Sequence, residues 1–197
     1  MIVQIFQCPQ YIEQEVTIQG WLVHKRSGGK VRFLVIRDGS GILQAVLLKN
    51  KVDPGTFQTF DPLTQESSLS LTGILHSDPR SPGGVEMEIT RLRVIHIAQD
   101  YPISPKEHGV AFLMEHRHLW LRSARQQAIL WIRHELIRAI HDFLDSRRFI
   151  QLAAPVLTPA ACEGTSTLFS TSYFDQGSAY LSQSGQLYME AGAMALG

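Results

Sequence analysis

The 197-residue sequence has few cysteines and no long apolar run. Its two cysteines, Cys8 and Cys162, are far apart and form no Cys-x-x-Cys or Cys/His ligand pattern, which disfavours a disulfide scaffold and a structural zinc site. No segment approaches the ~20 apolar residues that a membrane helix needs. The N-terminus lacks the charged region and cleavage site of a signal peptide, so we expect a cytoplasmic protein with no membrane partner.

The sequence also lacks an excess of either charge. Lys plus Arg and Asp plus Glu both number 18, which argues against a general polyanion binder with a basic surface. Any nucleic-acid site must therefore depend on a local cluster of cations. A hydrophobic content of 44% is typical of a globular chain, and this length allows one or two domains with a sizeable core.

Five apolar segments between residues 16 and 97 alternate with polar residues and are separated by turn-forming sequences. Gly20 interrupts the first segment, at a point where a small barrel could bend or bulge. The polar stretch 49–66 connects the third segment to the fourth and has room for a short helix. Five strands with one long connection between the third and fourth predict an OB-fold barrel.

The segment after the barrel is predicted to form a linker and a long helix in place of strands. Two prolines between residues 101 and 106 forbid regular structure, so we expect a linker over 99–116. A long helix is predicted from about Ser123 to Arg147, where Leu130, Ile137 and Leu144 recur every seven residues beside further apolar positions. This apolar stripe is wide enough for burial against a sheet or a partner. A strand ending at Pro155 is expected to follow.

Cations crowd the first predicted hairpin, where Asp38 is the one nearby acid: Lys25, Arg26, Lys30, Arg32 and Arg37. They fit either a solvated edge that discourages strand pairing or a basic groove for single-stranded nucleic acid. Phe33 lies among them, and its alternation phase opposes that of Leu34 and Ile36. Composition favours a core position for this ring, and a stacking platform for a base is the alternative.

The histidines invite a metal interpretation that their spacing does not support. His134 and His141 lie seven residues apart, two turns of one helix, which is too far to chelate one ion directly. With His116 and His118, they are predicted to be surface or interface residues. We expect no metal site in this chain.

Polar residues gather near the end of the chain, where a short strand is predicted to run into a helix. Gln183, Ser184 and Gln186 follow the loop that contains Glu163. One acid, two amides and a hydroxyl suit a small zwitterion such as an amino acid, since the carboxylate pairs with the ammonium and the amides fix its orientation. An ordinary polar strand-to-helix turn fits the same residues.

Three segments resemble a known family. Residues 143–155 resemble the first motif of the class II aminoacyl-tRNA synthetases, a helix followed by a strand ending in proline. Residues 158–169 resemble the mobile loop over the amino-acid pocket of the asparaginyl enzymes, and residues 180–187 resemble their amino-acid-binding strand. The likeness extends from residue 16 to 197 and lies in the subgroup shared by the aspartyl, asparaginyl and lysyl enzymes.

The resemblance implies roles for residues of the amino-acid pocket. It makes Glu163 the loop acid that closes over the substrate ammonium, with Ser184 and Gln186 lining the same pocket. Met189 stands where the aspartyl relatives have a lysine that pairs with the substrate carboxylate. A methionine cannot neutralise an anionic side chain, so asparagine is favoured over aspartate as the substrate.

The resemblance also implies an RNA site and a dimer surface. Arg26, Phe33 and Gln44 match the anticodon-reading positions of the family, with Phe33 stacked on the middle base and polar contacts from the other two. The first motif, including Pro155, implies a homodimer interface.

The implied architecture is an OB-fold anticodon-binding domain over 1–98, the linker 99–116, and part of a class II α+β catalytic domain, built on an antiparallel sheet, over 117–197. The full-length enzyme would use ATP and Mg²⁺ to activate asparagine and transfer it to its tRNA. Because the second and third motifs do not occur in these residues, we expect no catalytic residue among them. The chain alone is expected to bind tRNA weakly and to hold no cofactor. A stand-alone tRNA-binding module and part of an aspartyl enzyme are the alternatives.

Overall fold

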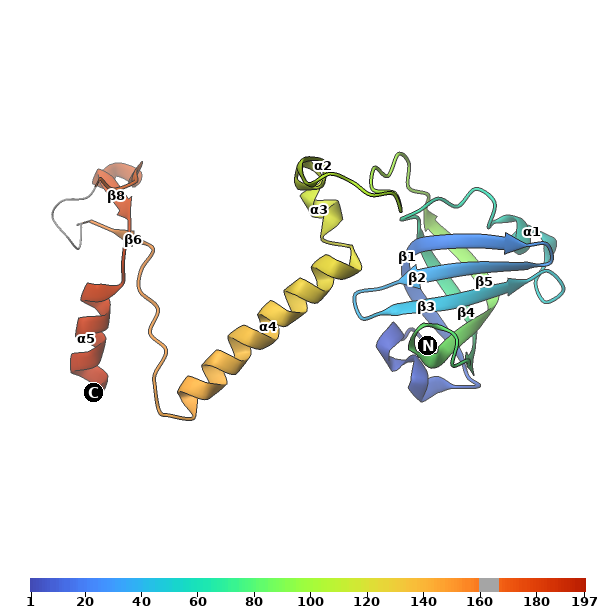
Figure 1. The fold of residues 1–197 in the computed structure, drawn as a ribbon, viewed down its shortest axis with the longest axis horizontal. Helices are drawn as coiled ribbons and strands as arrows, with labels where there is room; N and C mark the ends of the chain where they lie inside the picture. The colour runs from blue at the N-terminus through green and yellow to red at the C-terminus, as the bar shows by residue number, and fades with distance from the viewer. Residues whose placement is uncertain (160–166) are drawn as a thin grey trace. The chain divides into compact units, whose positions relative to one another are not determined.

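The computed structural model describes residues 1–159 and 167–197 (Figure 1). They form two compact units, Met1–Arg117 and His118–Gly197. None of the helices in the described residues is long and apolar enough to cross a membrane.

The first unit is built on a closed five-stranded barrel, as the alternation predicts. Its strands are β1 (Glu15–Gly28), β2 (Val31–Arg37), β3 (Ile42–Leu48), β4 (Ser68–Ser77) and β5 (Val85–His96), in the order β1-β2-β3-β5-β4. β4 closes the barrel against β1, and only the β3–β5 pair is parallel. The long connection holds the short helix α1 (Pro54–Gln58), and the 3-10 segments η1 (Ile5–Tyr11) and η2 (Pro82–Gly84) complete the unit. The predicted OB-fold barrel is confirmed.

The barrel core consists of every second residue of its strands. Leu34 and Ile36 of β2 and Leu69, Leu71 and Leu75 of β4 are completely inaccessible to solvent. Their neighbours on the same strands point outward, as the two-residue period of a strand requires. The hydrophobic effect of this burial is the main force that stabilises the unit.

Two glycines permit close approach of neighbouring strands inside the barrel. A Cβ at Gly73 would lie 2.2 Å from the carbonyl oxygen of Glu88, and one at Gly20 would lie 2.5 Å from that of Arg37. The bulge that the sequence placed at Gly20 lies instead between Leu22 and His24, where the β1–β2 register shifts. Gly20 is therefore a contact point between strands.

Asp38 organises the β2–β3 turn and attaches the N-terminal segment to it. Its Oδ1 accepts hydrogen bonds from the backbone N–H of Ser40 (2.7 Å) and Gly41 (2.9 Å), and its Oδ2 accepts one from Ile5 (2.8 Å). The sequence contained no signal for η1, because this segment depends on a contact with a residue 33 positions later.

The second unit contains the predicted long helix. α4 (Ala124–Asp145) begins after the N-cap Ser123, whose Oγ accepts a hydrogen bond from the backbone N–H of Gln126. Two short helices precede it in the chain: α2 (Val110–Glu115), which belongs to the first unit, and α3 (Arg117–Trp120). The linker predicted over 99–116 is therefore irregular up to Gly109 and helical from Val110.

A three-stranded antiparallel sheet follows α4, in the order β6-β8-β7. Its strands are β6 (Leu157–Thr158), β7 (Ser170–Ser172) and β8 (Ser178–Leu181), η3 (Phe174–Gln176) lies between the last two, and α5 (Gln186–Leu196) closes the unit. The predicted strand ending at Pro155 is wrong, because 151–155 has no regular structure and pairing starts at Leu157 opposite Leu181. Proline has no N–H to donate to a ladder, so the strand forms after it.

Candidate nucleic-acid interface and amino-acid site

Phe33 lies on the outer face of the barrel. Its neighbour Leu34 is buried at 0% exposure, whereas Phe33 is partly exposed and pairs across the β1–β2 ladder with Arg26. The Arg26 guanidinium carbon lies 4.2 Å from the centroid of the Phe33 ring. The ring is thus partly accessible to solvent, and its composition-based assignment to the core is wrong.

Gln44 lies beside this pair on β3, where it pairs with Val35 of β2 and Glu86 of β5. Its Nε2 donates to Glu86 Oε2 at 2.5 Å and to Ser81 Oγ at 3.3 Å. Since a carboxylate can only accept, Glu86 determines which way the amide points. Glu86 was not among the predicted site residues, although its alternation with buried Val85 places it on the outer face.

Two cations of the first hairpin bind the protein itself. Lys25 Nζ donates to the carbonyl oxygens of Phe60 (3.1 Å) and Asp61 (2.8 Å), and burial lowers the pKa of this ammonium against the attraction of Asp61. Arg32 lies 3.0 Å from the Asp61 carboxylate, stacks on Phe57 and donates to the Phe57 carbonyl. These contacts attach the connection that contains α1 to the barrel.

A third cation, Arg37, is buried with a counterion. Its Nη2 lies 3.0 and 2.9 Å from the two carboxylate oxygens of Glu66, and both residues are only 8% exposed. The guanidinium also lies 5.3 Å from the Trp21 ring. Lys25, Arg32 and Arg37 therefore have structural partners, so neither a solvated edge nor a continuous basic groove describes the cluster.

In the second unit, two predicted pocket residues meet where α5 begins. Ser184 Oγ accepts a hydrogen bond from the Gln186 backbone N–H at 3.2 Å, and Gln186 Nε2 donates to Glu190 Oε1 at 3.1 Å. The predicted strand does not reach them, because β8 ends at Leu181. Both lie in the turn and first residue of the helix, where the N-terminal backbone N–H groups need acceptors.

Met189 lies one turn further along α5 and faces another part of the unit. It lines a cavity of about 330 Å³ together with residues of 147–152 and the last residues of α5. Ser184 and Gln186 do not line this cavity. Glu163, the predicted loop acid, lies outside the described residues.

The predicted dimer surface has apolar side chains without cover. No residue of α4 is buried, and Trp131 and Ile132 are 62% and 67% exposed. Pro155 follows in the irregular segment before β6. Among the described residues, no group of three His, Cys, Asp or Glu side chains is arranged to hold a metal ion.

Each of the two parts of the chain matches a known protein family. Residues 16–95 match the OB-fold nucleic acid binding domain, and residues 110–196 match the class II tRNA synthetases for D, K and N. The chain is 54% identical over 188 residues to an asparagine–tRNA ligase of Desulforamulus reducens, covering 95% of the chain and 43% of that protein. A ligase of the same name from Roseiflexus is 52% identical over 182 residues, covering 92% of the chain and 41% of that protein.

Solved structures agree with these relatives. Asparaginyl-tRNA synthetase from Pyrococcus horikoshii, complexed with asparaginyl-adenylate, superposes with a TM-score of 0.89 at 38% identity, covering 98% of this chain and 45% of that one. The enzyme from Entamoeba histolytica gives 0.79 at 30% identity, covering all of this chain and 46% of that one. The chain spans less than half the length of these relatives. Residues 110–196 therefore match the class II tRNA synthetases of the aspartyl, lysyl and asparaginyl group, and the whole chain is similar to a portion of the asparaginyl members.

Proposed function

We propose that the protein carrying this chain joins asparagine to its tRNA, and that the barrel reads the anticodon. The observation that carries the RNA-reading role is the Arg26–Phe33 stack, which leaves an aromatic ring and a cation together on the outer face of an OB-fold barrel. Aromatic rings on such faces stack with unpaired bases, and nearby cations track the phosphate backbone.

Gln44 supplies base discrimination beside this platform. Both N–H groups of its amide have acceptors available, in Glu86 and Ser81, so Oε1 is left to accept from a base. The site therefore prefers a base edge that offers an N–H donor at this position. Phe33 adds affinity with little discrimination, since every base has a π-face.

The amino-acid pocket is proposed to include Glu163, Ser184, Gln186 and Met189. Ser184 and Gln186 lie together where α5 begins, which supports a shared role. Met189 lines a separate cavity, so its place in this pocket depends on the resemblance. It brings no charge, which suits a neutral amide substrate better than a carboxylate. The role of Glu163 depends on the resemblance of its loop.

The family uses ATP and Mg²⁺ in general. We propose that the full-length protein uses ATP and Mg²⁺ and that this chain alone holds neither. α4 and Pro155 are proposed as a homodimer surface, because the exposed apolar face of α4 needs a cover. The expected place of action is the cytoplasm.

A test of the RNA-reading role compares Phe33→Ala with Phe6→Ala, an exposed aromatic on η1 (58% exposed) away from the β1–β2 ladder. Phe33→Ala should weaken binding of the asparagine tRNA anticodon stem–loop by about 1–3 kcal/mol, the value of one base–aromatic stack. Phe6→Ala should bind normally. Fluorescence anisotropy measures binding, and thermal unfolding monitors the fold. Unchanged binding, or a loss of stability of several kcal/mol in Phe33→Ala, would contradict the proposal.

A further inference from the structure

We propose that Trp21 is a second base platform, which holds another unpaired base of the same RNA loop in the cavity beside it. This inference rests on the proposed reading of an anticodon loop by the barrel. Trp21 is 41% exposed, on a strand that also carries Arg26. The proposed role of Phe33 does not depend on a role for Trp21.

The ladder between β1 and β2 places Trp21 and Phe33 on one face. Directly paired residues share a face, and the pairs are Trp21 with Arg37 and Arg26 with Phe33. On β2, Phe33 and Arg37 are four residues apart and thus project to the same side, opposite buried Leu34. On β1, Trp21 and Arg26 are five residues apart, and the bulge between Leu22 and His24 brings both onto this same face.

The two aromatic residues form the same kind of pair with their partners across the strand. Arg26 lies 4.2 Å from the Phe33 ring, and Arg37 lies 5.3 Å from the Trp21 ring. Four residues of β2 separate the two pairs by about 13 Å. Because stacked bases rise by about 3.4 Å, bases on the two platforms cannot stack directly on one another. They suit the splayed bases of a single-stranded loop.

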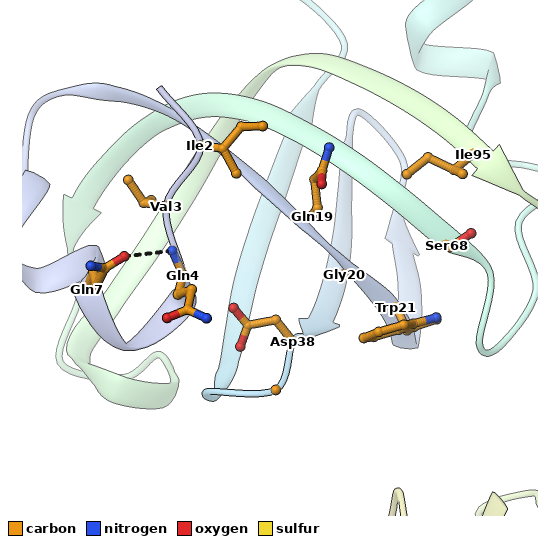
Figure 2. Close-up of a pocket in the computed structure, with 11 residues that line it drawn as sticks. Ile2, Val3, Gln4, Gln7, Gln19, Gly20, Trp21, Asp38, Ser68 and Ile95 are labelled. Carbon is orange, nitrogen blue, oxygen red and sulfur yellow. Dashed lines mark hydrogen bonds between the residues drawn. The ribbon is translucent and has the colours of Figure 1, made fainter.

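Beside Trp21 lies a cavity of about 540 Å³, within the usual range for small-ligand sites (Figure 2). Trp21, Gln19 and Ser68 line it together with the apolar side chains of Ile2 and Ile95. The Gln19 side chain is exposed and makes no hydrogen bond to another described residue, so its amide is available to a base edge. Apolar walls with a few polar groups suit a flat ring with polar edges.

The charged groups around this cavity already have partners within the protein. Arg37 is held by both carboxylate oxygens of Glu66 and does not line the cavity, so it stays on its own side of Trp21. Asp38, the acid in the lining, accepts hydrogen bonds from the three backbone N–H groups of the turn and of η1. A phosphate-bearing strand therefore meets no unpaired acid in this lining, among the residues that the structure describes.

The experiment uses the 197-residue chain with Trp120→Phe and Trp131→Phe, which leaves Trp21 as the remaining tryptophan. The probe is the asparagine tRNA anticodon stem–loop, together with a series in which each loop base in turn is removed. Stacking of a base on Trp21 should quench its fluorescence. Quenching should disappear when one particular base is missing, and this base should differ from the one whose removal cancels the effect of Phe33→Ala.

Variants complete the test. Trp21→Ala should weaken binding about 5- to 150-fold, equivalent to one lost base stack, and Trp21→Phe should retain most of the affinity. Removal of the base identified by quenching should make Trp21→Ala and the parent chain bind equally. If Phe33→Ala weakens binding while RNA leaves Trp21 fluorescence unchanged, the second platform is wrong and the proposed function survives. If neither Phe33 nor Trp21 affects RNA binding, the proposed function itself is overturned.

Discussion

The two units of this chain use apolar residues in opposite ways. In the barrel, the core residues of β2 and β4 are 0% exposed, whereas in α4 no residue is buried and Ile132 is 67% exposed. A barrel pairs all its strands with one another, and one face of each strand forms a closed core. A helix beside a small sheet covers its apolar stripe only when further layers pack against it. Apolar content alone therefore does not show which unit has a complete core.

The largest effect that tests this contrast comes from matched Leu→Ala substitutions. Leu71→Ala removes a side chain that is 0% exposed and should cost about 2–5 kcal/mol in barrel stability, since it leaves a cavity. Leu136→Ala, on α4 at 59% exposure, should change the free energy of unfolding by less than about 0.5 kcal/mol. Urea unfolding measures both. Equal losses would show that α4 is covered in solution, for instance in a dimer.

A slightly smaller contrast is expected for two ion pairs. Glu66→Gln leaves the Arg37 guanidinium buried without a counterion and should cost about 3 kcal/mol. Glu135→Gln removes a pair with Arg138 on α4 whose side chains are 57% and 63% exposed, and should change stability by about 0.5 kcal/mol or less. Thermal unfolding of both variants checks this. A similar cost for the two would mean that water reaches Arg37.

The smallest predicted effect is a pH dependence from Cys8, which is 1% exposed in the barrel core. Burial, assisted by the negative charge of Asp38, raises the pKa of this thiol from 9.0 to about 11. A raised pKa favours the folded state at low pH, and this contribution is lost as the pH rises from 9.0 to about 11. Over the lower half of that interval the loss should be about 1 kcal/mol, because the thiol of the unfolded chain is already half ionised at its lower end.

Comparison with a Cys8→Ala chain isolates this contribution, because the other titrating groups are common to both chains. The difference in unfolding free energy between the two chains should shrink by the stated amount over that pH range. A constant difference would show that the thiol is exposed to water in the folded barrel.

Much of the fold followed from local pattern. Alternation and turn residues predicted the five strands and the long connection. Apolar residues spaced seven apart predicted α4, which starts after Ser123. The failures lie where local preference is weak. The strand expected before Pro155 forms after it, and the strand expected to reach Ser184 ends at Leu181, because short strands depend on their partners.

The candidate site was predictable in its residue types and less so in their arrangement. Pattern alone left Phe33 between core and surface, and the strand register decided for the surface. The cluster of five cations was visible in the sequence. The sequence could not show that Lys25 and Arg32 bind a connection roughly 30 residues later.

The sequence by itself determined the barrel, the long helix and the resemblance to a family, because strand alternation, helical periodicity and local motifs are properties of consecutive residues. Only the tertiary structure decided that Arg37 is buried against Glu66 and that Trp21 shares a face with Phe33. The burial of Arg37 depends on the connection before β4, where the Glu66 backbone N–H donates to the Leu22 carbonyl oxygen. The shared face of Trp21 and Phe33 depends on the register of β1 and β2 on either side of a bulge. Register is a long-range property, since one shifted residue would turn every following side chain to the other face.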